Sequence, residues 1–236
     1  MVKRSLRQLA LSCRTDHDGR RHGPCSRSDY GSFNAMRRSL PVLTVTMLVL
    51  AACTSHDGTK ANLADQQLRY ANEPFPMRIV DRKRFGAALQ PAVVQAPAGY
   101  AEGTIVVDTQ RRQLHLIEAN GKARRYGIGV GATGRAWSGE AVVGRKAAWP
   151  AWHPTDEMRQ ETPDLPRRIE PGPANPLGAR ALYLHADGRD TLYRIHGTSE
   201  PWTIGTEASS GCIRMLNEDV IDLYDRVRPG AAVVVL

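Results

Sequence analysis

The sequence predicts a mainly β domain with one late helix, and three features of residues 103–236 carry this prediction. Short apolar stretches alternate with polar residues, as in QLHLIE at 113–118, which is the pattern of a half-buried strand. The pair Asn120-Gly121, between two such stretches, is a strong hairpin signal. Seven of the fifteen prolines fall within 150–176, which excludes a regular helix or a central strand there.

The first strands are expected to form an antiparallel meander. TIVVDT at 104–109, QLHLIE at 113–118 and RRYGIGVG at 124–131 are the three predicted strands, and β texture continues in EAVVGRKAAW at 140–149. The alternation in the second strand places Leu114 and Leu116 on the opposite side of the pleat from His115 and Ile117.

The second half of the domain is expected to begin with a long shaped loop at 150–176, since long loops in compact domains usually have a function or are disordered. ALYLH at 181–185 and TLYRIH at 191–196 read as two strands joined by a turn, and AAVVVL at 231–236 closes the chain as a strand. NEDVIDLYDRV at 217–227 is predicted to be an amphipathic helix. Its expected N-cap is Asn217, and its apolar face consists of Val220, Leu223 and Val227.

The N-terminal part is organised differently. MRRSLPVLTVTMLVLAAC at 36–53 has a positive start, a short apolar run and small residues before Cys53, the plan of a secretory signal peptide. Leu50 to Cys53 further resembles the bacterial lipobox, which implies lipidation of Cys53 and, with Thr54 next, sorting to the outer membrane. The alternatives are an ordinary signal peptide that is cut nearby and an uncleaved anchor.

The chain is therefore divided into four segments. Residues 1–35 are interpreted as a mis-annotated or disordered extension, because signal peptides begin at the N-terminus. Residues 36–53 are the lipoprotein signal peptide, 54–102 are a tether with a partly ordered lead-in that is rich in proline, and 103–236 are the folded domain. We expect a periplasmic, lipid-anchored protein that contacts the membrane through Cys53.

The basic charge of the chain is concentrated in the leader. Residues 1–52 contain nine basic and three acidic side chains, whereas 53–236 contain 23 basic and 21 acidic ones. A nearly neutral body argues against a nucleic-acid partner. Of the four cysteines, Cys13 and Cys25 lie in the extension and Cys53 in the signal peptide, so Cys212 is the one thiol of the mature body.

An unpaired cysteine in an exported protein is either a reactive thiol or a buried small hydrophobe. A cysteine nucleophile needs a base and donors for the oxyanion that forms. His196, sixteen residues before Cys212, is the candidate base. Gly211 lets the backbone approach a substrate, so that N–H groups at 211–213 are candidate oxyanion donors. Arg214 and the following helix are expected to lower the pKa of the thiol.

The stretch HGTSEPWTIGTEASSGCIRMLNEDVIDLY at 196–224 resembles the signature of the YkuD-type L,D-transpeptidases, the pattern H-G-T followed by S-x-G-C-I-R-M. The resemblance extends back through NPLGARALYL at 175–184 and to about Gly103. It implies a β-sandwich-like catalytic domain with one short helix after the nucleophile. It also implies Cys212 as the nucleophile and His196 as its base.

The remaining signature residues are carried over by position, and they are Ser209, Ser210, Gly211, Arg214, Gly197 and Thr198. Gly197 lies where the family orients the imidazole through a neighbouring acceptor. Ser210 is a departure, because many members have histidine there, and it leaves open how the acceptor amine is deprotonated.

The resemblance implies peptidoglycan stem peptides as partners and a thioester intermediate that needs no cofactor. The acyl group would then pass to a second stem peptide as a 3→3 cross-link, or to a lipoprotein. Transfer to water would make the protein an L,D-carboxypeptidase. Acylation of Cys212 by a carbapenem is a further expectation from the family.

Two other classes of function are weighed against this one. A sortase-like or papain-like protease is one alternative, but papain-like chains place Cys before His. The other is a non-catalytic wall-binding lipoprotein. An activated Cys212 predicts alkylation by iodoacetamide well below pH 8.

Other conspicuous side chains are given structural roles. His115, His153 and His185 are interpreted as surface or packing residues, and Trp137, Trp149, Trp152 and Trp202 as core or loop anchors. Trp149 and Trp152 are the two that a substrate groove could also use. A single cysteine with scattered histidines gives no metal-ligand spacing, so no metal site is expected.

Overall fold

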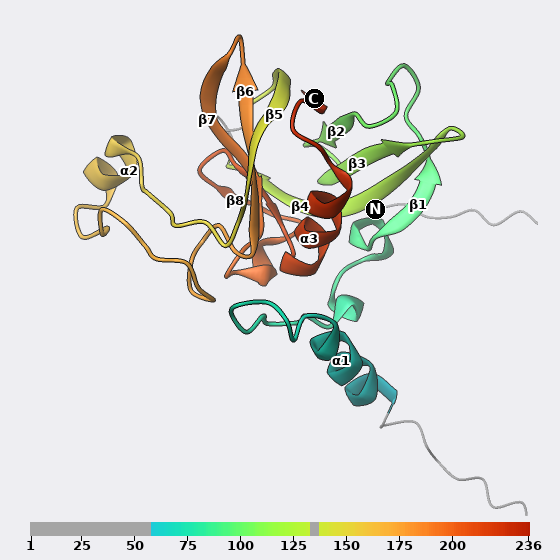
Figure 1. Cartoon of the computed structure of the whole chain (residues 1–236), viewed down its shortest axis with the longest axis horizontal. Helices are drawn as coiled ribbons and strands as arrows, with labels where there is room; N and C mark the ends of the chain where they lie inside the picture. The colour runs from blue at the N-terminus through green and yellow to red at the C-terminus, as the bar shows by residue number, and fades with distance from the viewer. Residues whose placement is uncertain (1–57, 133–136) are drawn as a thin grey trace, which may run out of the picture. The chain divides into compact units, whose positions relative to one another are not determined.

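The computed structural model describes residues 58–132 and 137–236 (Figure 1). The predicted extension at 1–35 and the signal peptide with Cys53 lie outside the described residues. Within the described part of the chain, no helix combines the length and the apolar character needed to cross a bilayer.

A single sheet of ten strands forms the body of the domain, which confirms the mainly β prediction (Figure 1). The strands are β1 (Ala92–Gln95), β2 (Ile105–Asp108), β3 (Gln113–Glu118), β4 (Lys122–Gly131), β5 (Gly139–Ala148), β6 (Arg180–Ala186), β7 (Arg189–His196), β8 (Glu207–Ser209), β9 (Ile213–Met215) and β10 (Ala232–Val235).

The helices are short and lie between or before these strands. They are α1 (Gly58–Arg69), α2 (Asp156–Glu161) and α3 (Asn217–Arg226), with single 3-10 turns η1 (Arg82–Arg84), η2 (Ala87–Leu89) and η3 (Pro201–Thr203). The late helix was predicted, and its predicted apolar face is buried, since Val220, Leu223 and Val227 are at most 3% exposed.

The sheet closes on itself through β9. The strand order runs β4-β3-β2-β10-β5-β6-β7-β9, and β9 also pairs with β4. The ten-residue β4 makes this possible because it uses its two halves differently. Its first half, Lys122–Arg125, pairs with β1, whereas Ile128 and Gly129 pair with β9. The result is a barrel-like sheet with its apolar side chains turned inward.

The interior is filled by apolar side chains from almost every strand and from α3. The largest fully buried members are Tyr126, Ile105, Leu114, Ile128, Leu182, Leu184, Ile195, Met215 and Leu223. The Tyr126 hydroxyl donates a 2.6 Å hydrogen bond to Asp222 of α3. Burial and this carboxylate raise the pKa of Tyr126 far above its ordinary value.

Both predicted hairpin turns have the backbone that their residues favour. Asn120 and Gly121 have φ angles of 59° and 66°, and Asp187 and Gly188 have 50° and 73°. Two successive positive φ angles define a type I′ turn, whose twist matches that of paired strands. The predicted meander of β2, β3 and β4 is therefore confirmed, as is the β6–β7 hairpin.

Two local predictions are wrong. The proline-rich segment contains α2, because the eight residues between Pro154 and Pro163 leave room for a turn and a half. Thr155 caps this helix by accepting from the Met158 N–H. Asn217 is not the N-cap of α3; Leu216 holds that position without a side-chain cap, and the Asn217 side chain has other partners, described below.

The lead-in at 70–95 is more ordered than its composition indicates. Met77 is buried in a small cluster with Trp149, Ala179 and Ile221. Glu73 accepts from the Trp149 indole N–H at 2.7 Å and pairs with Arg180 at 2.5 Å. Next along the chain, Arg82 forms a two-bond ion pair with Asp219 of α3, at 2.6 and 3.1 Å. The segment is thus fastened to the sheet and to α3 at several points.

Candidate active site

Two parallel strands place Cys212 and His196 on one face. β7 pairs with β9 in the register Ile195↔Ile213 and His196↔Arg214. Cys212 directly precedes β9. Since side chains two residues apart share one face of a strand, this register places Cys212 on the same face as His196.

The turn that presents Cys212 is shaped by the hydroxyl of Ser209. Ser209 is buried, donates to the Cys212 carbonyl at 2.6 Å and accepts from the Gly211 N–H at 3.2 Å. Gly211 has a φ of 123°, which other residues rarely adopt. The Gly211 N–H, one of the expected oxyanion donors at 211–213, is bonded to Ser209 in this structure. The Cys212 N–H has no acceptor among the described residues.

The imidazole of His196 is held in one tautomer. Its Nδ1 lies 2.6 Å from the Gly197 carbonyl oxygen, and because a carbonyl can only accept, Nδ1 carries the hydrogen. Nε2 is then unprotonated and able to take a proton. Burial, with the nearby charges of Arg214 and Arg194, lowers the pKa of His196 to about 4, so the ring is neutral at neutral pH.

Asn217 holds the backbone that orients His196. Its Oδ1 accepts from the N–H groups of Ala179 and Thr198 at 3.0 and 3.2 Å, and its Nδ2 donates to the Thr198 carbonyl at 3.0 Å. A Cβ on Gly197 would lie 2.1 Å from the same Oδ1. The glycine of the His-Gly-Thr sequence is therefore required by the close approach of this amide.

Cys212 is half-buried, and its thiol faces the carbonyl of Leu192, with 3.9 Å between Sγ and the oxygen. Burial raises the pKa of the thiol, although the Arg194 backbone N–H and the charges of Arg194 and Arg214 act in the opposite direction. The expectation of a lowered thiol pKa is therefore wrong. In addition, β9 separates Cys212 from α3, so the helix does not start directly after the turn.

Arg214 is engaged in the structure of the site. Its guanidinium pairs with Glu200 at 2.8 Å and approaches the Thr203 hydroxyl at 3.4 Å. Thr198, which is buried, accepts from the Glu200 N–H at 2.9 Å. These bonds tie the residues after His196 to the strand after Cys212.

A bulge in β7 brings the Leu192 carbonyl to the thiol. Leu192 has a φ of 65° and its side chain is 63% exposed. The pairing of β6 and β7 shifts between Tyr183 and His185, and the Asp190 carboxylate accepts from the Leu192 N–H at 2.9 Å. A leucine with positive φ is strained, and here the strained residue lies beside the candidate nucleophile.

Two cavities meet at Cys212. One of about 390 Å³ includes Ser210 and Glu157 in its lining, and one of about 250 Å³ includes Arg145 and His153. Thr155, Met158 and Leu192 line both cavities as well as Cys212. The thiol is thus reached from two sides, with Thr155 and Met158 of the proline-rich segment contributing to each.

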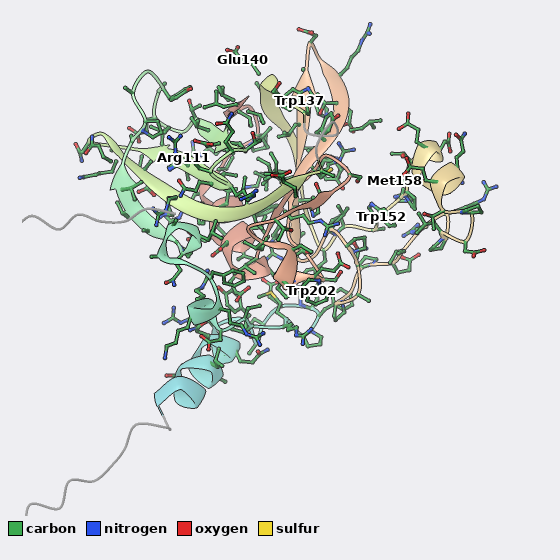
Figure 2. The ribbon with its side chains drawn as sticks, turned by 180° about the vertical axis from the view of Figure 1, so that it is seen from behind. Arg111, Trp137, Glu140, Trp152, Met158 and Trp202 are labelled. Carbon is green, nitrogen blue, oxygen red and sulfur yellow. The ribbon has the colours of Figure 1, made fainter. Side chains whose placement is uncertain are left out.

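The other histidines and tryptophans occupy varied positions. Trp152 lines the smaller cavity together with the exposed His153, and Figure 2 shows Trp152 near Met158. Trp149 is buried against Phe75 and lines neither cavity at Cys212. Trp202 is 63% exposed, so its prediction as an anchor is wrong.

The remaining three members of this group pack against their neighbours. Trp137 stacks on Tyr193 with 5.5 Å between ring centroids. The His185 ring covers Gly144, and His115 is half-buried in β3, where burial lowers its pKa. Among the described residues, no three side chains of His, Cys, Asp or Glu gather as ligands for a metal ion.

Several residues of the site were not predicted as such from the sequence. Asn217 looks like a helix cap, and Leu192, Arg194 and Arg145 look like ordinary strand residues. The register shifts in β5 and β7 that bring the last three to the cavities depend on strand pairing. No local sequence signal marks them.

Sequence comparison identifies relatives for the folded part of the chain. Residues 102–235 match the YkuD family, described as the L,D-transpeptidase catalytic domain. The probable L,D-transpeptidase ErfK/SrfK of Salmonella typhimurium is 35% identical over 146 residues, covering 59% of this chain and 46% of the relative. The probable L,D-transpeptidase YbiS of Escherichia coli is 35% identical over 140 residues, covering 56% and 44%. The chain thus spans about half the length of the curated relatives it matches.

Two solved structures are similar to the chain, with TM-scores of 0.45 and 0.43. One, from Brucella melitensis, is described as a probable carnitine operon oxidoreductase; it is 48% identical and covers 66% of this chain and 99% of that one, with a TM-score of 0.45. An L,D-transpeptidase from Mycobacterium smegmatis is 17% identical and covers 56% and 58%, with a TM-score of 0.43. Structural likeness at this level carries no argument about activity. The family match, in contrast, includes every strand from β2 to β10 and both His196 and Cys212, and on this ground the chain belongs to the YkuD family of L,D-transpeptidase catalytic domains.

Proposed function

We propose that this protein is a peptidoglycan L,D-transpeptidase in which Cys212 is the nucleophile and His196 its base. The observation that carries the proposal is the arrangement around the thiol. Cys212 lines two cavities, and the buried imidazole of His196, on the same face of the paired strands, has no hydrogen-bond partner for Nε2 among the described residues. A transferase needs this arrangement because its nucleophile must meet a donor and an acceptor.

In the first step, Sγ attacks the carbonyl at the L-centre of diaminopimelate in a tetrapeptide stem. The thiol proton passes to Nε2 of His196 as the S–C bond forms. It then moves to the nitrogen of the terminal D-alanine as the C–N bond breaks. The neutral thiol and neutral imidazole of the free site are the correct starting states for such a coupled transfer.

The oxyanion formed in this step needs a preorganised donor. The Cys212 N–H is the candidate, because its neighbour at Gly211 is bonded to Ser209. Ser209 therefore contributes indirectly, by holding the Cys212 carbonyl and so the direction of the following peptide.

In the second step, an amine attacks the thioester, the C–S bond breaks and a proton returns to Sγ through His196. An amine of a neighbouring stem would give a 3→3 cross-link, and an amine of a lipoprotein would give protein attachment. Exposed Ser210, in the larger cavity, occupies the position where many relatives have histidine. Deprotonation of the acceptor is therefore assigned to His196 alone.

The decisive experiment compares the wild type with Cys212→Ala on disaccharide-tetrapeptide, with products identified by mass. A cross-linked dimer that has lost one D-alanine, made by the wild type only, is the expected result. Tripeptide without dimer would assign the second candidate, an L,D-carboxypeptidase that uses the same thioester. Absence of any product, together with no mass increase after a carbapenem is added, would leave a wall-binding protein.

The location follows from the same proposal. A stem-peptide substrate requires a protein outside the inner membrane, and the leader at 36–53 provides the export signal. We assign the protein to the periplasm, held by a lipid on Cys53 and oriented toward the outer membrane. Metabolic labelling with a palmitate analogue tests this, since label on the wild type and its loss in Cys53→Ala are expected.

A further inference from the structure

The two cavities at Cys212 differ in charge. The charged residues lining the smaller one are Arg145 and Arg194, and no Asp or Glu of the described chain lines it. The larger one is lined by Glu157 and Glu161 and by no Arg or Lys of the described chain. One thiol therefore lies between a positively charged and a negatively charged cavity.

Arg145 is the group in the smaller cavity whose charge is not balanced. Its guanidinium lies over the ring of Tyr183, 3.5 Å from the centroid, and Arg194 lies 4.4 Å from the same ring. Arg194 is paired with Asp190 at 2.7 Å. Arg145 has no carboxylate or carbonyl partner among the described residues, so its five N–H donors are available.

The setting of Arg145 favours a flat, two-bond contact. Arg145 is opposite Tyr183 in the β5–β6 pairing, next to the register shift in β5. Stacking on an aromatic face restricts the guanidinium plane, and a planar fork matches the two oxygens of a carboxylate. The Tyr183 hydroxyl, which has no hydrogen-bond partner in the described chain, supplies one more donor to the same cavity.

We propose that Arg145, supported by Tyr183, binds the carboxylate of the donor's terminal D-alanine; this rests on the function proposed above. That carboxylate is separated from the attacked carbonyl by only a nitrogen and a Cα, so it must lie within a few ångströms of Sγ. The exposed Glu157 would repel it from the larger cavity and would attract an ammonium group there. The leaving group thus lies in the smaller cavity with Arg145, and the acceptor amine enters through the larger, acidic cavity.

The donor stem offers other carboxylates as well, among them the one at the D-centre of diaminopimelate, so the test uses three substrates. They are the disaccharide-tetrapeptide, the same compound with its terminal D-alanine as the carboxamide, and the same compound with the diaminopimelate carboxylate amidated. The rate of release of D-alanine, or of its amide, gives kcat/KM. The variants are Arg145→Gln, Arg145→Lys and, as a matched control, Arg228→Gln, which removes an exposed arginine far along the chain.

The wild type and Arg228→Gln are expected to prefer the free D-alanine carboxylate about 10- to 100-fold over the terminal carboxamide, the range for a hydrogen bond between charged groups. Arg145→Gln should lose this preference, and Arg145→Lys should keep part of it. Amidation of the diaminopimelate carboxylate should leave this preference unchanged, both in the wild type and in the variants. An unchanged melting temperature for Arg145→Gln checks folding.

The possible failures are distinguishable. A wild-type preference that persists in Arg145→Gln overturns the subsite and leaves the transpeptidase intact. A preference that follows the diaminopimelate carboxylate instead overturns the assignment to D-alanine. Absence of D-alanine release by the wild type overturns the proposed function and the subsite together.

Discussion

The protonation states of Cys212 and His196 describe a neutral pair in the free protein. Burial raises the pKa of the thiol and lowers that of the imidazole to about 4. A preformed thiolate–imidazolium pair would need the opposite shifts. In the proposed mechanism the proton would therefore move during attack on the substrate, from the neutral thiol to the neutral imidazole.

The pH dependence of the reaction follows from these shifts. Below about pH 4 His196 is protonated and cannot accept the thiol proton, so kcat/KM should fall as the pH drops through about 4. Alkylation of free Cys212 by iodoacetamide should remain slow at pH 7 and increase only above the ordinary thiol range of about 8.5. Rates measured from pH 3.5 to 10, with circular dichroism as a control for unfolding, test both. An acidic limb near 6.5 would contradict a buried neutral His196.

Asn217 is predicted to be a positioning residue. In Asn217→Asp the two acceptor contacts to Ala179 and Thr198 persist, but the donor to the Thr198 carbonyl is lost. We expect kcat to fall about fivefold while KM changes little, since one hydrogen bond is worth about 1 kcal/mol. Asn217→Ala should fall further. A variant that lost only thermal stability and retained kcat would show that the amide holds the fold and not the imidazole.

Cys212 and His196 could be proposed as the nucleophile and its base from the sequence because they lie within a continuous signature. The roles of the neighbouring residues could not be predicted from the sequence. Ser209 proved to shape the turn, Gly211 proved to have a committed N–H, and Asn217 proved to hold the His196 loop. Each of these roles depends on contacts between residues on different elements, which spacing along the chain does not determine.

Among the elements, β7 combines a regular strand with a strained bulge. Leu192 has a φ of 65° with its side chain mostly exposed, so the side chain contributes little packing to offset the strain. Asparagine tolerates this backbone better than leucine, and valine tolerates it worse. The bulge is the feature that directs the Leu192 carbonyl toward Sγ.

Leu192→Asn should therefore raise the free energy of unfolding by up to about 1 kcal/mol, and Leu192→Val should lower it by about 1 kcal/mol or more. Urea denaturation of the two variants beside the wild type provides the measurement. Equal stability of all three would mean that the backbone relaxes at this position.

The lead-in at 70–95 is expected to stabilise the domain through Glu73. This carboxylate contacts both the Arg180 guanidinium and the Trp149 indole, and the Arg180 hydrogen bond is the main cause of its lowered pKa. Glu73→Ala should cost about 1–3 kcal/mol of stability, because Arg180 and Trp149 lose their acceptor. Glu157→Ala, at an exposed position, serves as the comparison for thermal melting. A melting temperature unaffected by Glu73→Ala would make the lead-in a passive attachment.

Strands with clear alternation and the two type I′ hairpins could be predicted because their signals are local. The short strands β1, β8 and β9 could not, since no clear apolar alternation marks them in the sequence and they pair with strands distant along the chain. The helix α2 was missed for a different reason. The proline content of the segment argued against a helix, but the eight residues between Pro154 and Pro163 are enough for a short one.

For the whole molecule, the main unpredicted property is the closure of the sheet. The chain order of the strands gives no indication that the three-residue β9 pairs with both β4 and β7. Met215 of β9 is fully buried among the core side chains. Closure and core packing therefore meet in the strand that directly follows Cys212.

Met215→Ala should lower the free energy of unfolding by about 2–4 kcal/mol, the usual range for truncating a buried methionine. Because β9 closes the sheet, the loss should appear as a lower midpoint in a single cooperative transition. Denaturant unfolding followed by tryptophan fluorescence and by circular dichroism measures this. Transitions that separate between the two probes would show that β9 opens without the rest of the sheet.

The position of the nucleophile at this closure has a consequence for laboratory evolution. A variant that fails to close its sheet also loses the placement of its thiol. Selection for catalysis would therefore remove misfolded members of a library, without a separate screen for solubility. Cys212 would then serve as an internal reporter of folding, and labelling by a reactive acyl probe would sort mutants by their folded fraction.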